Sequence, residues 1–430
     1  MQALRELKQS TTQTRLSGLK FENGSVWANQ SRSAARDRVL DMGLPHKRDE
    51  YWKFSDPASL VDMSVKPAAL LETDETAVFG EIDRLKVVFV DGVFDADASD
   101  PLEMENLEIL RLSDVFNHDI HWAKDLYGVL EARGQSPVER PLAALNTAFA
   151  TDGIVIRATG QVSKPINLIY HHKNKQSDAI LHHVVKVEEG AELTILETGP
   201  AAARFNKVME ADIADSGKFH HVRAQGRDHE RRAITGMFAR LGTKSSFKSF
   251  TLTANGVLTR NECVIELTGD DAIAHVAGAA VGDGNDFHHD DTIFITHDAV
   301  NCESRQVFKK VLRNGAVGVF QGKILVKEGA QKTDGYQISQ SLLLDGDSQF
   351  LAKPELEIYA DDVICSHGST SGAIDEEALF YLRSRGIETA KATDLLTLAF
   401  LAEALDEIED EALADDLRFR LESWLARRSS

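Results

Sequence analysis

A cysteine and a histidine two positions apart are the residues of this sequence best suited to bind a metal. They are Cys365 and His367, in the stretch KPELEIYADDVICSHGSTSG that runs from Lys353 to Gly372. Thiolate sulfur and imidazole nitrogen are donor atoms of zinc and iron-sulfur sites. Such closed sites take about four ligands, so this pair needs donors from elsewhere.

The residues before the pair predict a strand. Charged and apolar side chains alternate over residues 355–358, which is typical of a strand with one buried and one solvated face. We expect this strand to stop at Asp361 and Asp362. Gly368 and Gly372 then loosen the segment that carries the pair, so that its backbone can approach a ligand or a partner.

The other cysteines do not complete a site. Cys263 and Cys302 lie far from Cys365 in the sequence, and no CxxC spacing is present. An alternative without a metal therefore stays open. In that interpretation Cys365 is a small buried residue and His367 an ordinary hydrogen-bonded histidine.

Three stretches around the pair resemble the SufB/SufD family of iron-sulfur cluster scaffold proteins. They are GKILVKEGAQKTDGYQISQSLLLDG from Gly322, the KPELEIYADDVICSHGSTSG stretch, and FYLRSRGI ending at Ile387. Near the N-terminus, Gly43-Leu44-Pro45 with Glu50 and Trp52-Lys53-Phe54-Ser55 is similar to the family's GLP and EDWKYT residues. YADDVICSHG resembles the SufD branch, and where SufB proteins carry a GDxCGAH segment this chain has GDSQF from Gly346, without a cysteine.

The resemblance implies a set of partners and a shared site. A SufB-like subunit would pair with this chain through their β-helices, and the ATPase SufC would dock on C-terminal helices. For the isolated chain, a homodimer is the alternative. A nascent iron-sulfur cluster would be bound by His367 together with a SufB cysteine. Cys365 would be either a second ligand or a neighbouring structural residue, and a flavin is a further cofactor implied for the complex.

Composition narrows the class of partner. The 430 residues include 48 Lys and Arg against 68 Asp and Glu, a formal charge of -20, which argues against nucleic acids and anionic membranes and favours protein partners. Three cysteines cannot build a disulfide framework and fit a reducing cytosol. The N-terminus lacks the apolar core of a signal peptide, and the most apolar run, Leu395 to Leu405, is short. We therefore expect a cytoplasmic protein without a membrane span.

Residues 1–150 predict an N-terminal domain of mixed, mainly helical structure. Trp52 and Phe54 are interpreted as its packing residues. The expected elements are a polar segment to about Gln30, a helix capped by Ser31 or Ser33 that ends near Gly43, a buried strand over Leu85–Val90 followed by a turn, a helix over Leu110–Arg133, and a boundary near Thr151.

Residues 151–371 predict a β domain, because short apolar runs recur between Gly, Asn and Asp turns without helices. A doubly wound sheet is excluded, since its parallel strands need helical crossovers. A sandwich, a propeller and a solenoid stay open on the pattern alone. The resemblance implies a right-handed parallel β-helix, so the expected fold is mostly β with helical ends.

Residues 372–430 predict a C-terminal helical domain. Asp375 begins a first helix that Gly386 closes, and apolar stripes mark two more, over Leu398–Ile408 and Leu413–Trp424. A β-helix leaves unpaired strand edges at its ends, and we expect this tail to cap one of them.

The sequence matches the known motifs of enzymes poorly. The glycines from Gly315 to Gly322 have the wrong spacing for a phosphate loop, and Ile324 stands where its Ser or Thr belongs. Adjacent histidines point to opposite faces of a strand, so such pairs predict no metal site; His288-His289, in an expected loop, stays open as an accessory ligand. We expect a non-catalytic scaffold.

Two other functions are alternatives to the scaffold. A β-helix carbohydrate-active enzyme would use paired carboxylates, Asp290 with Asp361 or Asp362. A homopolymeric filament of β-helices is the other alternative.

Overall fold

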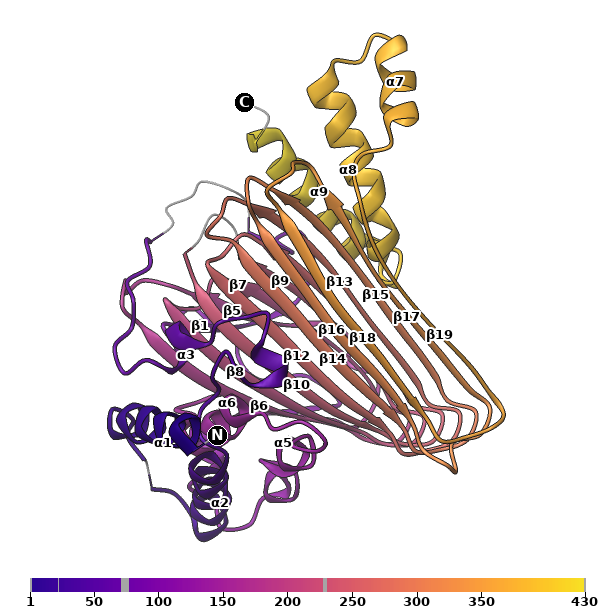
Figure 1. The fold of residues 1–430 in the computed structure, drawn as a ribbon. Helices are drawn as coiled ribbons and strands as arrows, with labels where there is room; N and C mark the ends of the chain where they lie inside the picture. Colours follow the sequence, from indigo (N-terminus) through magenta and orange to yellow (C-terminus); the bar gives the residue numbers. More distant parts are fainter. Residues whose placement is uncertain (1, 22, 71–76, 227–229, 429–430) are drawn as a thin grey trace.

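Two sheets of mostly parallel strands form the body of the molecule (Figure 1). The computed structural model describes residues 2–21, 23–70, 77–226 and 230–428. Within this part, consecutive strands from β4 onward alternate between a nine-stranded and a ten-stranded sheet, and each pairs in parallel with the strand two places along. This arrangement is a parallel β-solenoid, which confirms the expected mostly β fold with helical ends.

The strands of the nine-stranded sheet are β3 (Leu107–Arg111), β4 (Ile154–Ala158), β6 (Asp178–Val187), β8 (Arg204–Ile213), β10 (Arg232–Leu241), β12 (Leu258–Leu267), β14 (His288–His297), β16 (Val317–Val326) and β18 (Gln349–Ile358). Those of the ten-stranded sheet are β1 (Leu85–Val90), β2 (Val93–Phe94), β5 (Ile166–His171), β7 (Glu192–Gly199), β9 (Lys218–Gly226), β11 (Ser246–Ala254), β13 (Ile273–Asp283), β15 (Glu303–Arg313), β17 (Thr333–Leu343) and β19 (Val363–Gly372).

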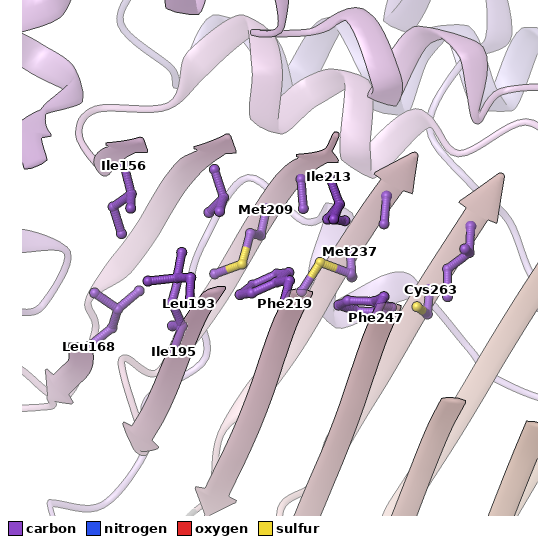
Figure 2. Close-up of a cluster of buried hydrophobic side chains, with 14 of the residues drawn as sticks. Ile156, Leu168, Leu193, Ile195, Met209, Ile213, Phe219, Met237, Phe247 and Cys263 are labelled. Carbon is purple, nitrogen blue, oxygen red and sulfur yellow. The ribbon is translucent and has the colours of Figure 1, made fainter. Parts of the chain in front are cut away.

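The space between the sheets is the main core. Figure 2 shows apolar side chains of both sheets, among them Ile195, Met209 and Phe219, pointing toward one another. Alternation along each strand sends every second side chain into this space. The apolar runs of the sequence therefore do form strands, as predicted, for instance in β4 and β16.

The sequence pattern did not reveal every strand, because polar side chains are also buried. In β8, Lys207 faces the interior and Glu210 faces the N-terminal helices, and both are almost fully buried. The turns also differ in length: Asp178 pairs with Arg204, whereas Val317 pairs with Gln349. This variation explains why the sequence has no strict repeat.

Helices of the N-terminal region cover the outer face of the nine-stranded sheet. They are α1 (Gln2–Ser17), α2 (Val26–Met42), α3 (Ala58–Val61), α4 (Leu112–Val115), α5 (Val129–Arg133) and α6 (Pro141–Phe149), with 3-10 turns at Glu50–Trp52 and Trp122–Asp125. Asn146 of α6, for example, donates to backbone oxygens of β6 and β8. The strand predicted over Leu85–Val90 is confirmed as β1, which pairs with β5.

The polar opening segment forms α1, whose buried Arg15 bonds Asp178 of β6. Two predictions for this region were wrong. Ser25, not Ser31 or Ser33, precedes α2, although α2 does end at Gly43. The helix predicted over residues 110–133 is broken into α4, a 3-10 turn and α5, because Arg111 still belongs to β3.

Three C-terminal helices follow the solenoid: α7 (Glu376–Ser384), α8 (Thr389–Leu405) and α9 (Glu411–Arg428). The Asp375 side chain caps α7, as predicted. Apolar residues of α8 and α9, such as Leu401 and Leu417, pack against Val222 and Phe250 on the outer face of the ten-stranded sheet. The tail therefore covers a flank of the solenoid instead of capping its end, so that expectation was wrong.

Among the described residues, no helix combines the length and the apolar character that crossing a membrane requires.

Candidate functional site

The last turn of the solenoid has two open edges. Within the described part of the chain, β18 pairs with β16 alone and β19 with β17 alone (Figure 1). Ile364 and Tyr359 are exposed at this end, by 74% and 64% respectively. Unpaired N–H and C=O groups beside exposed apolar side chains suit association with another chain.

Cys365 and His367 lie on the edge strand β19. The prediction of a loosened segment after Asp362 was therefore wrong. The strand forms because β17 supplies its hydrogen bonds, with Gly335 opposite Cys365 and Gln337 opposite His367.

The pair belongs to a row of side chains that continues the interior of the solenoid. On β17, Gly335, Gln337, Ser339 and Ser341 are buried or nearly so, and residues 365, 367, 369 and 371 are their partners on β19. Ser339 Oγ lies 3.1 Å from Ser369 Oγ, and Ser341 Oγ lies 3.0 Å from Ser371 Oγ. Sequence reasoning missed this row, although the repeat of small and polar residues at every second position was a usable signal.

The two candidate ligands differ in exposure. Cys365 is half-buried and packs against a small apolar cluster that includes Ile324 and Val326. A Cβ atom at Gly335 would lie only 3.1 Å from Cys365 Sγ, so glycine makes room for the thiol there. Burial raises the pKa of the Cys365 thiol, and nearby Asp334 raises it further. His367 is exposed.

Among the residues that the structure describes, no third ligand joins the pair. Within residues 2–21, 23–70, 77–226 and 230–428, no three His, Cys, Asp or Glu side chains gather as a metal site would require. Cys263 lies between the sheets, where burial raises the pKa of its thiol to about 12, and Cys302 is also buried. A closed cluster site at His367 would therefore need donors from a partner.

The His182-His183 pair splits between opposite faces of β6, as predicted. His183 Nε2 lies 2.9 Å from the Tyr170 hydroxyl in the interior, whereas His182 Nε2 lies 2.8 Å from Glu210 Oε2 on the outer side. His288 and His289 begin β14 and are not in a loop, which corrects that expectation.

The proposed accessory ligands already have partners away from β19. His288 Nε2 lies 2.8 Å from the Ser55 hydroxyl, and His289 Nδ1 lies 2.9 Å from Lys310 Nζ. Burial lowers the pKa of both imidazoles. Both histidines belong to the nine-stranded sheet, so the structure does not join them to His367 on the other sheet.

The carboxylates of the alternative enzyme do not form a pair. Asp290 is fully buried and accepts hydrogen bonds from Ser55 and Arg260. Asp361 and Asp362 are exposed at the turn before β19. A buried carboxylate that is already paired cannot reach a polysaccharide. The stretch from Gly315 to Ile324 is a turn followed by β16, which is not the strand, loop and helix of a phosphate site.

The N-terminal segment whose residues resemble the EDWKYT motif lies against the last turns. The Tyr51 hydroxyl donates to Glu355 Oε2 of β18 at 2.6 Å, and Lys353 Nζ lies 3.9 Å from the centre of the Tyr51 ring. Arg260 of β12 donates to the Tyr51 carbonyl at 2.8 Å. This segment thus ties the edge strand β18 to the earlier turns of the sheet.

Comparison with known proteins gives a consistent result. Residues 170–400 match the model of the family described as "SUF system FeS cluster assembly, SufBD core domain". The chain is 28% identical to an iron-sulfur cluster assembly SufBD family protein of Synechocystis sp., over 96% of this chain and 94% of that protein. It is 27% identical to the iron-sulfur cluster assembly protein SufD of Escherichia coli, over 89% of this chain and 90% of that protein. Identity to the SufD protein of Bacillus subtilis is 26%, over 65% of each chain.

Proposed function

This chain belongs to the SufBD family of the SUF system for iron-sulfur cluster assembly, and we propose that it is the SufD-type scaffold subunit of a cytoplasmic SufB-SufC-SufD complex. In this proposal the chain is not an enzyme. Hydrolysis of ATP belongs to SufC, and the nascent cluster is the cargo of the complex.

His367 is the ligand that this chain contributes to the cluster. The observation that carries this assignment is the place of His367, exposed on an edge strand whose interior-facing row carries one thiol and one imidazole. Burial raises the pKa of the Cys365 thiol, which disfavours the thiolate that would ligate. A neutral imidazole ligates without losing a proton and is released when it is protonated, which suits a transient site.

The SufB-like subunit covers the open end of the solenoid. The unpaired edges of β18 and β19 and the exposed Ile364 support this placement. Because no third ligand from this chain is present among the described residues, the partner supplies the remaining donors, at least one of them a thiolate.

SufC docks on the C-terminal helices, chiefly on α7. None of the side chains of α7 is buried, and its Phe380 and Tyr381 are exposed by 70% and 56%. The solenoid already covers the apolar residues of α8 and α9 that join its core, whereas α7 offers two adjacent aromatic side chains that are uncovered.

The test compares three variants in the purified three-subunit complex. His367→Ala is expected to leave the complex assembled and active as an ATPase but to reduce cluster absorbance strongly. Cys365→Ser is expected to have a smaller effect. Ser369→Ala, two residues along the same row, is the matched control and retains normal cluster formation. Normal cluster formation by His367→Ala, or a defect in Cys365→Ser alone, would reject the assignment.

A further inference from the structure

A buried amide lies next to His367 in the ladder between β17 and β19. Gln337 is the Cα partner of His367 and is completely inaccessible to solvent. Its Nε2 donates to Oε1 of Gln306, the next residue of the same row on β15, at 3.0 Å. One side of the Gln337 amide is therefore fixed by the strand behind it.

The other side of this amide has no partner. Among the described residues, Gln337 Oε1 is a buried acceptor without a hydrogen bond. An unsatisfied buried acceptor costs about 1–3 kcal/mol. Ser339 and Ser341, the next residues of the row, do bond their partners on β19. The acceptor without a partner thus lies on β17 at the position paired with His367.

A glycine on the facing sheet gives this amide its space. A Cβ atom at Gly322 would lie 2.3 Å from Gln337 Nε2 and 2.7 Å from its Cδ. Any larger side chain at position 322 would displace the amide. The space and the bond to Gln306 together hold Gln337 in one place, next to the edge strand.

We propose that Gln337 is a positioning residue for His367. In the part of the chain that the structure describes, Gln337 Oε1 has no partner and the His367 side chain is exposed. Rotation of that side chain toward β17 lets one ring N–H of the neutral imidazole donate to Gln337 Oε1. Adjacent strands lie about 4.8 Å apart, so side chains of one row on paired residues are within reach of each other. A neutral imidazole has one N–H and one lone pair. With the N–H engaged, the lone pair of the other nitrogen is presented to a metal.

The consequence for the cluster rests on the proposed function, whereas the hydrogen bond itself does not. Residues that accept the second N–H of a ligating histidine fix its tautomer and orientation, and their loss costs about 10-fold to 100-fold in metal affinity. Gln337 is not a ligand, because it is buried behind the edge strand.

The hydrogen bond is tested in the isolated chain by nitrogen-15 NMR of labelled histidines. The His367 signals are assigned from their absence in His367→Ala. In the wild type we expect a single dominant His367 tautomer and slow exchange of its ring proton. Gln337→Met, which has similar length but no acceptor oxygen, is expected to mix the tautomers and speed proton exchange. Gln337→Glu restores an acceptor and should recover the wild-type pattern.

The matched control is Ser339→Ala, which removes a bond between the same two strands without changing the neighbour of His367. It should leave the His367 signals unchanged. An unchanged tautomer ratio in Gln337→Met would overturn the proposal, as would equal perturbation by Ser339→Ala. If Gln337→Met does not fold, Gly322→Ala tests the same bond by displacing the amide, and unchanged His367 signals there overturn it too.

Cluster formation in the three-subunit complex separates the two proposals. A loss of about 10-fold in cluster affinity in Gln337→Met, with Ser339→Ala normal, supports both. A perturbed tautomer together with normal cluster formation by His367→Ala rejects the proposed function but keeps the hydrogen bond.

Discussion

Arg260 Nη1 lies 2.6 Å from Asp290 Oδ2, and neither side chain is more than 1% exposed. The Arg260 guanidinium also stacks 4.2 Å from the centre of the Trp52 ring. Attraction between the opposite charges lowers the pKa of Asp290 despite its burial, and it raises the pKa of Arg260. The ion pair links β12 to β14, and the contacts of its two members with Ser55 and Trp52 join the N-terminal segment to the solenoid.

Breaking this buried pair should destabilise the protein strongly. Arg260→Met leaves the Asp290 carboxylate buried without its counter-charge, which costs about 3–5 kcal/mol of unfolding free energy. Arg240→Met is the control, because Arg240 pairs with Asp212 on the partly solvated surface and should cost about 1 kcal/mol or less. Urea unfolding measures both variants, and equal losses would contradict this account.

Acid should destabilise the fold through buried neutral histidines. Burial lowers the pKa of His297 from 6.5 to about 4, so the folded imidazole stays neutral where the unfolded one takes up a proton. The contribution of neutral His297 to the stability of the folded state is complete above pH 6.5 and is lost as the pH falls toward 4. His297→Gln should reduce the slope of stability against pH in this window by up to ~1.4 kcal/mol per pH unit. An unchanged slope in urea titrations would contradict the prediction.

The C-terminal helices should be part of the folded unit. Leu417 is fully buried between α9 and the ten-stranded sheet, so Leu417→Ala should cost about 2–5 kcal/mol in chemical unfolding. Phe419→Ala, two residues further along α9, is the matched control; this side chain is 56% exposed, and its loss should cost at most about 0.5 kcal/mol. If Leu417→Ala is harmless, the tail does not depend on its contact with the solenoid.

Docking of SufC should depend on the aromatic surface of α7. Replacing Phe380 and Tyr381 together by alanine is expected to weaken SufC binding by at least about 10-fold, because exposed aromatic side chains are typical anchors of protein interfaces. Calorimetric titration measures the affinity. Thermal unfolding should be unchanged, since neither side chain is buried. Wild-type affinity in this variant would place the docking surface elsewhere.

Thiol reagents should distinguish the three cysteines of the native chain. Cys263 and Cys302 are buried, and burial raises the pKa of both thiols. We expect only the half-buried Cys365 to react before unfolding, and more slowly than a free cysteine because its own pKa is raised. Cys365→Ser should abolish this reaction, and rapid native labelling of Cys263 would show that the interior is open.

Much of the fold could be predicted from local patterns. Short apolar runs such as those of β1 and β4 form buried strands. The Asp375 cap and the apolar stripes of α8 and α9 follow from the same local chemistry. The resemblance of several stretches identified the family, whereas ligation by the residues at 365 and 367 stays a prediction.

Tertiary structure decided how the candidate site is built. By itself the segment after Asp362 has the glycine and serine content of a loop, and it becomes β19 because β17 supplies its hydrogen bonds. The same pairing brings Gln337, distant in sequence, beside His367. Burial of Asp290 likewise depends on Ser55 and Arg260, which lie far from it in the chain. These contacts join residues of different turns, and no local pattern encodes which residues of two turns become neighbours.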